Sequence, residues 1–333
     1  GQVLVEESIL GWEELELEVV RDKDNNMITV CFIENIDPLG VHTGDSFCAA
    51  PMLTISEECQ KRLQEQAYKI VESVEVIGGT NVQFAHDPVT DRIIVIEINP
   101  RTSRSSALAS KATGFPIALV SAMLATGLTL KDIPCGKYGT LDKYVPDGDY
   151  VVIKFARWAF EKFKGVEDKL GTQMRAVGEV MSIGKNYKEA FQKAIRSLET
   201  GRYGLGHAKN YNTMTKEELL HLLINPTSDR HFIMYEAIRK GATTEGFSDK
   251  YLSQLLEIPE EEIRNHRISL GVEEAWEGVH VSGTKDSAYY YSTYNAKDKN
   301  PVSEAKPKIM ILGGGPNRIG QGIEFDYCCV HAA

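Results

Sequence analysis

The chain has 333 residues, of which 42% are hydrophobic and 25% charged, and its formal net charge is −10. This is ordinary globular composition, and the length suffices for two or three domains. The acidic balance argues against a nucleic-acid partner, because neutralising phosphates requires clustered Lys and Arg. No apolar run approaches the ~20 residues of a membrane span, and no signal peptide precedes Val3. We therefore expect a cytoplasmic protein without membrane contact.

Two alternating strands are predicted near the start of the chain. In Glu13–Val20, alternate residues face opposite sides of a strand, so leucine and valine side chains share one face and three glutamates share the other. Acids on one strand face are usually solvated, and we expect Glu16 and Glu18 to face water. The Asp24–Asn26 turn then leads into a second strand, Met27–Ile33.

A helix and a hairpin follow. Ser56 can cap a helix over Ser56–Val76, whose apolar residues form one stripe. Alternation in Thr80–His86 and in Ile93–Asn99, joined by turn residues between them, predicts an antiparallel hairpin. Gln83 is then expected opposite Glu97.

The segment Ile93–Asn99 carries the strongest chemical signal. With regular alternation, Glu97 and Asn99 share a face with Ile93 and Val95 on a strand that reads as buried. A carboxylate and an amide oxygen are hard donors of the kind that Mg²⁺ accepts. Arg101 and Arg104 follow directly and supply positive charge where a transferring phosphoryl group needs it. The alternative is a strand end that is merely capped and salt-bridged.

The remaining elements form three blocks. Pro116 suits the first turn of a helix that stops near Gly127. The rest of the first block is predicted to contain the strands Asp149–Ala156 and Met174–Ile183 and the helix Asn186–Thr200. A second, helical block has a capping box at Thr215–Glu218 and helix-like patterns over Asp229–Lys240 and Pro259–Ser269.

The third block follows a polar linker, Asn295–Lys308. Ile309–Leu312 predicts a short buried strand that leads into a glycine-rich turn. This turn matches neither the dinucleotide fingerprint nor the P-loop, because Arg318 and Gln321 occupy positions that require glycine and lysine.

The cysteines show no metal-binding or disulfide pattern. No C-x-x-C pair occurs and no histidine lies at zinc-finger spacing, so zinc is not indicated and buried thiols in a reducing compartment are expected. The six are Cys31, Cys48, Cys59, Cys135, Cys328 and Cys329.

Five segments together resemble the large chain of carbamoyl phosphate synthetase. They are Val5–Trp12, Gly40–Ser46, Asn81–Phe84, Glu97–Gly114 and Gly313–Gly322. The resemblance spans nearly the whole chain and weakens only over about 205–290. It implies an α/β architecture of the α+β ATP-grasp kind, followed by a mainly helical domain and a short Rossmann-like opening segment.

The resemblance also implies domain boundaries. Residues 1–203 correspond to the C-terminal portion of the ATP-grasp domain that makes carboxyphosphate, 204–292 to the oligomerisation domain, and 293–333 to the linker and first strand of the second half. Both ends are expected to be cuts through a longer protein. The 333 residues alone are expected to be inactive, because an ATP-grasp site clamps its nucleotide between two lobes.

Site residues carry over from the family by position. Near the nucleotide these are Glu7, Ile9, Glu14, Gly40, Val41, His42, Gln83 and Glu97; at the divalent ions Gln83, Glu97 and Asn99; and at the bicarbonate or carboxyphosphate Arg101, with Arg104 beside it. Ile9 stands where leucine is common in the family, which is harmless if its contact is made by the main chain.

The implied function is ATP-dependent activation of bicarbonate to carboxyphosphate, on the way to carbamoyl phosphate for arginine or pyrimidine biosynthesis. ATP, Mg²⁺ or Mn²⁺ and K⁺ are the implied cofactors. The implied partners are a glutaminase small chain and further copies of the same chain. Two alternatives are another ATP-grasp carboxylase such as biotin carboxylase, and a non-catalytic oligomerisation module.

Overall fold

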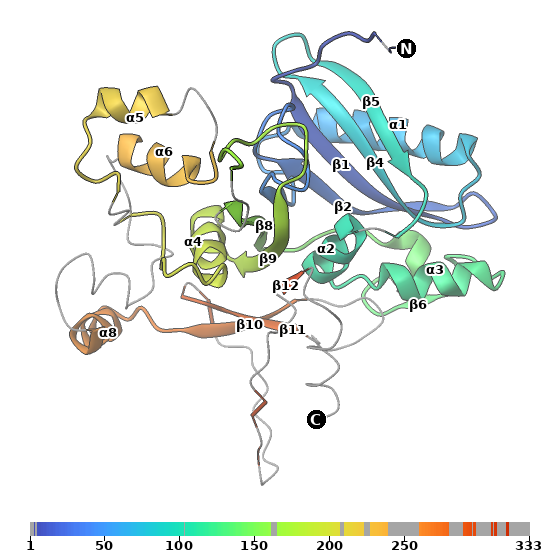
Figure 1. Cartoon of the computed structure of the whole chain (residues 1–333). Helices are drawn as coiled ribbons and strands as arrows, with labels where there is room; N and C mark the ends of the chain where they lie inside the picture. Colours follow the sequence, from blue (N-terminus) through green and yellow to red (C-terminus); the bar gives the residue numbers. More distant parts are fainter. Residues whose placement is uncertain are drawn as a thin grey trace. The chain divides into compact units, whose positions relative to one another are not determined.

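The computed structural model describes most of the first 206 residues and parts of the rest (Figure 1). The described residues are 3, 5–102, 104–160, 165–206, 210–222, 227–238, 260–279, 289–294, 296–297, 308, 310–311 and 318–319. They divide into two compact units, Gly1–Pro146 with Gly171–Met174 and Asp147–Leu170 with Arg175–Ala333.

The first unit is built on an antiparallel sheet of order β3-β2-β1-β4-β5. Its elements are β1 (Glu13–Arg21), β2 (Met27–Asn35), β3 (Cys48–Ala50), α1 (Glu57–Ser73), β4 (Gly78–Asp87), β5 (Arg92–Asn99), α2 (Arg104–Thr113), α3 (Ile117–Ala125), β6 (Pro134–Cys135), β7 (Gly139–Thr140) and a 3₁₀ turn, Leu141–Lys143. The predicted strands β1 and β2, helix α1 and hairpin β4–β5 are confirmed.

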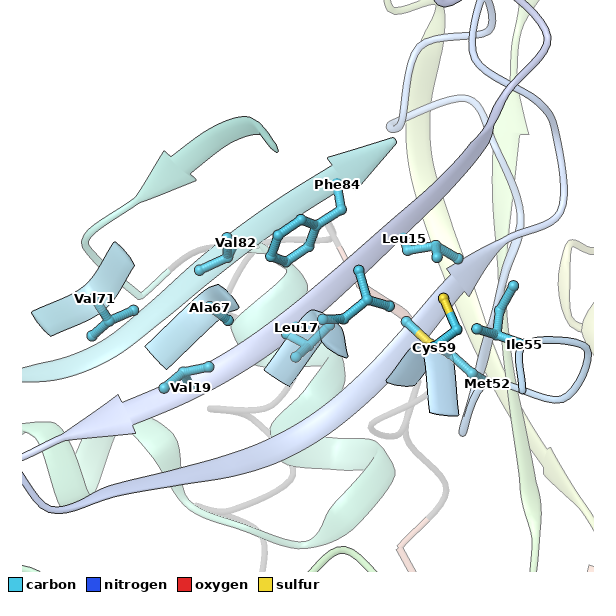
Figure 2. Close-up of a cluster of buried hydrophobic side chains, with 11 residues drawn as sticks. Leu15, Leu17, Val19, Met52, Ile55, Cys59, Ala67, Val71, Val82 and Phe84 are labelled. Carbon is cyan, nitrogen blue, oxygen red and sulfur yellow. The ribbon is translucent and has the colours of Figure 1, made fainter. Parts of the chain in front are cut away.

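Helix α1 covers the apolar face of this sheet. Ser56 caps it as predicted, since its side chain accepts a hydrogen bond from the backbone N–H of Cys59. The buried stripe of α1 packs against Leu15 and Leu17 of β1 and Phe84 of β4, as Figure 2 shows. This cluster is the main hydrophobic core of the unit.

Helices α2 and α3 contact the sheet as well. The α2 side chain of Ser106 reaches Glu18, on the face of β1 opposite the leucines. Helix α3 approaches the start of β4 so closely that a Cβ atom at Gly79 would lie 2.6 Å from Ile117 Cγ2. The Gly79 N–H donates to Ser121 Oγ at 2.9 Å, so glycine is required there for close helix–strand contact.

The second unit joins a hairpin to helices. Its elements are β8 (Val151–Trp158), β9 (Ala176–Gly184), α4 (Tyr187–Ser197), α5 (Lys216–Leu222), α6 (Arg230–Ile238), α8 (Glu260–Ser269), β10 (Ala275–Val279), β11 (Tyr289–Thr293) and β12 (Arg318–Ile319). Strand β9 pairs with both β8 and β12, and α4 packs against β8 and β9.

The second unit only partly matches the predicted block of helices. The capping box is present, because Thr215 and Glu218 exchange hydrogen bonds at the start of α5. The β10–β11 hairpin within the block predicted as helical was not anticipated. Its strands read Ala-Trp-Glu-Gly-Val and Tyr-Tyr-Tyr-Ser-Thr, which are aromatic and β-branched segments typical of strands. The predicted strand Ile309–Leu312 and the glycine-rich turn fall mostly outside the described residues.

Among the described residues, no single helix is long and apolar enough to cross a membrane. Residues Ser105–Thr113 and Ile117–Ala125 reach that length and character only as a pair, bent by 109°.

The packing of this core predicts how much stability is lost when one of its side chains is truncated. Leu17 is fully buried, so Leu17→Ala is expected to lower the free energy of unfolding by about 2–5 kcal/mol through lost burial and the cavity left behind. Urea denaturation monitors this loss. Val89→Ala in the exposed hairpin turn is the control and should stay within about 0.5 kcal/mol of the parent chain; equal effects of the two changes would contradict the assignment of this core.

Candidate functional site

The second face of the first unit's sheet is polar. Glu14, Glu16 and Glu18 project from it along β1, and all three are buried, with relative exposures of 2%, 3% and 0%. The prediction that Glu16 and Glu18 face water is therefore wrong. The sequence pattern of β1 identified the face correctly, but α2 packs against β1, β2 and β4 and removes this part of it from solvent.

Amide and hydroxyl donors satisfy the buried carboxylates. Asn35 donates to Glu16 at 3.0 Å. Asn81 Nδ2 lies between two acids and donates to Glu16 at 3.1 Å and to Glu18 at 3.0 Å. Ser106 of α2 donates to the other Glu18 oxygen at 2.8 Å. Donors from β2, β4 and α2 thus converge on one strand.

Burial raises the pKa of Glu18 to about 7. The hydrogen bond from Ser106 opposes this shift, whereas the neighbouring charge of Glu16 adds to it. The side-chain oxygens of Asn35 and Asn81 are also buried and have no hydrogen-bond partner among the described residues. The buried end of the face therefore presents unpartnered oxygen acceptors beside carboxylates, a donor set that suits a cation.

The hairpin β4–β5 extends the polar face to the edge of the sheet. Gln83 lies opposite Glu97 as predicted, and Asn81 lies opposite Asn99. Asn99 donates to Glu97 Oε1 at 2.9 Å. Within the described part of the chain, the side chain of Gln83 makes no hydrogen bond, and the residue is only partly buried. Glu97, Asn99 and Gln83 are thus grouped where ions and solvent reach them.

A β-bulge at Ile96 decides which face these ligands occupy. Val95 pairs with Phe84, yet Glu97 pairs with Gln83, so one extra residue separates the two pairs. Ile93 and Ile98 both pack on the apolar core although they are five positions apart. The prediction that Ile93 and Val95 share a face with Glu97 is therefore wrong, and so is that of a buried strand, because Glu97 is exposed.

Arg101 lies just beyond the strand end. It is exposed, and its guanidinium is 3.5 Å from Asn99 Oδ1. Its backbone N–H donates to the carbonyl of Asn99 at 2.8 Å, which fixes the chain direction after the proline. The side chain of Arg104 lies outside the described residues.

Two loops predicted to border the nucleotide lie side by side. The Gly11 N–H donates to Leu39 O at 2.9 Å, and the Leu39 N–H donates to Trp12 O at 2.8 Å. Gly40 follows with a φ of +119°, a conformation that favours glycine. The segments containing Ile9 and Gly40 are therefore adjacent in space, although thirty positions separate them in the sequence.

The second of these loops is tied to the polar face. Thr43 donates a hydrogen bond to Glu14, and Val41 beside it is buried. His42 is exposed, and its Nδ1 accepts from the Gly44 N–H at 2.9 Å. Of the predicted site residues, Glu14, Val41 and His42 thus cluster at the start of β1.

Glu7 has a different partner, Arg92 at the start of β5. It forms a two-pronged ion pair with Arg92, at 2.7 and 2.9 Å, and the hydrogen bond and charge of Arg92 lower the pKa of this exposed carboxyl. Its role at a nucleotide stays a prediction. Asn81, by contrast, was missed as a site residue, although the alternation Asn81-Val82-Gln83 places it on the same face as Gln83.

Comparison with known proteins defines the class of this polar face. Residues 1–133, which contain it, match the family model for the ATP-binding domain of the carbamoyl-phosphate synthase L chain. Residues 179–245 match the model for the oligomerisation domain of the large chain, and 305–333 match the preATP-grasp domain model of the same enzyme. The chain belongs to the carbamoyl phosphate synthase large-chain family.

Whole-sequence relatives agree. The chain is 43% identical over 383 residues to the carbamoyl phosphate synthase large chain of Synechocystis sp., covering 100% of this chain and 35% of the relative. It is 44% identical over 385 residues to that of Neisseria meningitidis serogroup B, with the same coverage. The chain thus spans about a third of the length of these relatives. Both alignments are longer than the 333 residues of the chain, so the relatives carry segments that it lacks.

A solved structure is similar at greater distance. Pyruvate carboxylase of Rhizobium etli superposes on 45% of this chain and 13% of its own, with 18% identity and a TM-score of 0.39. A resemblance this distant has no bearing on the function of the chain.

The buried acid of β1 predicts a pH dependence of stability. The pKa of Glu18 is about 7 in the folded chain, compared with 4.5 for an ordinary glutamate. Between these two pH values the carboxyl is protonated in the folded state and ionised in the unfolded state. The free energy of unfolding therefore falls as pH rises through this window. Glu18→Gln removes the contribution of Glu18 to this slope, a relative change on the order of 3 kcal/mol across the window.

Urea denaturation at about pH 5 and about pH 8 measures this effect. Glu65→Gln, on the exposed side of α1, is the control and should keep the slope of the parent chain. A Glu18→Gln variant that differs from the parent chain equally at both pH values would show that Glu18 does not titrate in this range.

Proposed function

We propose that the protein containing this chain uses ATP to activate bicarbonate as carboxyphosphate, on the way to carbamoyl phosphate. The observation that carries the proposal is the pairing of Gln83 with Glu97 across β4 and β5, with Asn99 beside them on an open polar face. The activity is proposed for the whole protein, because the chain spans 35% of its relatives and we expect the 333 residues alone to be inactive.

The donors at the open end of the face fit a divalent cation. Gln83, Glu97 and Asn99 offer the hard oxygen atoms that Mg²⁺ or Mn²⁺ takes, and the carboxylate supplies the negative charge. Such an ion, when bound, neutralises phosphate charge as the phosphoryl group is transferred. Buried acceptor oxygens of Asn35 and Asn81 next to Glu16 suit K⁺ at the other end of the face.

The remaining residues bind and orient the substrates. Arg101, exposed beside Asn99, is suited to hold the oxygens of bicarbonate while one of them attacks the γ-phosphorus and ADP leaves; Arg104 is proposed as its partner. The loops with Ile9 and with Gly40, Val41 and His42 border the nucleotide, and Glu14 and Glu7 are proposed to bind its ribose and adenine ends.

The remaining parts of the proposal concern organisation. We assign 1–203 to the ATP-grasp portion, 204–292 to an oligomerisation domain and 293–333 to the start of the second half. The match of 179–245 to an oligomerisation domain supports this family over a biotin carboxylase, and because it begins before residue 204 the boundary at 203/204 stays a proposal. A glutaminase small chain as partner and a cytoplasmic location complete it.

Loss of one charge tests the metal assignment. In the full-length protein, Glu97→Gln keeps the side-chain size but removes the negative charge that balances the cation, so bicarbonate-dependent ATP hydrolysis is expected to fall by at least ~100-fold. Glu65→Gln on α1 is the matched control. Near-normal hydrolysis by Glu97→Gln at saturating magnesium would exclude Glu97 from the site.

Self-association provides a separate test. Apolar side chains in the described part of 204–292 are exposed, among them Met234, Leu270 and Trp276 at 45%, 66% and 45%, and such side chains favour an interface. Analytical ultracentrifugation of the chain is expected to show a mass that rises with concentration. A strict monomer at high concentration would contradict the proposed role of this domain.

A further inference from the structure

A second cluster of chemically active side chains lies at the end of the apolar face of the first unit's sheet. It consists of Cys59 on α1, His86 on β4 and Asp91 in the β4–β5 turn, with one ligand atom from each within 4.8 Å of the others. Glu13 on β1 adjoins them. The polar face with Glu97 is on the other side of the sheet, so this cluster is separate from the proposed ATP site.

Backbone structure places each member. Glu13 and His86 are direct partners in the β1–β4 register, on the same face as Leu15 and Phe84. Cys59 is the third residue after the Ser56 cap of α1, in the first turn of the helix. Asp91 has a φ of 57°, and its N–H donates to Asp87 O at 2.8 Å, which folds the turn back onto His86.

The imidazole of His86 is held between two carboxylates. Its Nδ1 is 2.7 Å from Glu13 Oε2, and its Nε2 is 2.9 Å from Asp91 Oδ1. The other Asp91 oxygen pairs with Arg62 of α1. Each potential ligand therefore has an outer partner: Glu13 orients the imidazole, and Arg62 orients the carboxylate. Carboxylate–histidine pairs of this kind support metal sites.

The thiol distinguishes this cluster from a simple ion-pair network. Cys59 and His86 are 4% and 8% exposed, and the Cys59 sulfur makes no hydrogen bond among the described residues. Cys59 also belongs to the apolar core cluster, yet its sulfur lies at the edge of that core, within 4.8 Å of a ligand atom of both His86 and Asp91. Thiolate, imidazole and carboxylate together are a donor set that Zn²⁺ prefers, at distances of ~2.0–2.3 Å.

We propose that Cys59 Sγ, His86 Nε2 and Asp91 Oδ1 bind one divalent transition-metal ion of the zinc type. The ion takes the place of the proton between His86 and Asp91, and the thiol releases its proton to solvent on binding. Asp91 is 63% exposed in its side chain, so the fourth position is open to water. Because the three ligands come from α1, β4 and the hairpin turn, the ion clamps these elements together.

The test uses the metal-stripped chain without a histidine tag. Zn²⁺ is titrated in competition with a chromophoric chelator, and Co²⁺ serves as the optical probe, since cobalt bound to a thiolate gives a near-ultraviolet charge-transfer band. We expect one ion per chain at this site, the thiolate band, and a rise in melting temperature with Zn²⁺ that Mg²⁺ does not produce.

Matched variants connect this binding to the cluster. Cys59→Ser is expected to abolish the cobalt–thiolate band, whereas Cys135→Ser, a buried cysteine of β6, should leave it unchanged. Glu13→Gln, which alters only the outer partner, is expected to weaken Zn²⁺ binding by about 10–100-fold. Asp91→Asn replaces Cys59→Ser as the test variant if the latter does not fold, because Asp91 lies in an exposed turn. It is also expected to weaken Zn²⁺ binding.

Two outcomes would overturn the proposal. One is the absence of tight Zn²⁺ binding by the parent chain. The other is binding, with an intact thiolate band, that survives both Cys59→Ser and Asp91→Asn, which would assign the ion to other cysteines of the chain.

Discussion

The burial of two carboxylates on β1 is the constraint on which the first unit depends. A buried carboxylate is costly unless it is hydrogen-bonded, and Glu16 and Glu18 receive their donors from Asn35, Asn81 and Ser106. These donors belong to β2, β4 and α2, so the positions of three elements are set by one strand. A register slip of one residue would place leucines among the amide donors and glutamates in the core, which makes alternative pairings costly.

The polar face changes character across the sheet. At β1 the acids are closed in by α2, and burial raises the pKa of Glu18 to about 7. At β5, an edge strand, Glu97 is exposed. The closed end fixes the geometry of the face, and the open end is accessible to solvent. The bulge at Ile96 makes this possible, because it turns Glu97 toward Gln83 while Val95 stays opposite Phe84.

Both faces of the β1–β4 pair carry a group of polar side chains, and the register between the two strands positions both groups. Glu13 pairs with His86 at one end of the apolar face, and Glu16 pairs with Gln83 on the polar face. The two groups differ in the softness of their donors. Amide and carboxylate oxygens suit magnesium, whereas thiolate and imidazole suit zinc. Competition between the two sites for one metal is thereby minimised.

Much of the fold and part of the site followed from the sequence by itself. Period-two alternation located β1, β2 and the hairpin, and capping residues located α1 and α5. The pairing of Gln83 with Glu97 depends in addition on the bulge, because the turn alone would place Gln83 opposite Ile96. The turn residues between the two strands predicted the hairpin. These are local properties, decided by residues within a few positions of one another.

Other features of the site depend on contacts between residues far apart in the sequence, which only the tertiary structure shows. Whether Glu16 and Glu18 meet water depends on α2, about ninety positions away in the chain, and no local pattern contains that information. The bulge at Ile96 could not be predicted either. In a run of isoleucine and valine, both possible registers place apolar side chains on the core face, and only the packing of Ile93 and Ile98 against the core distinguishes them. Cys59 and His86 come together only because α1 packs across the end of β4, which is why their separation in the sequence gave no indication of a metal site.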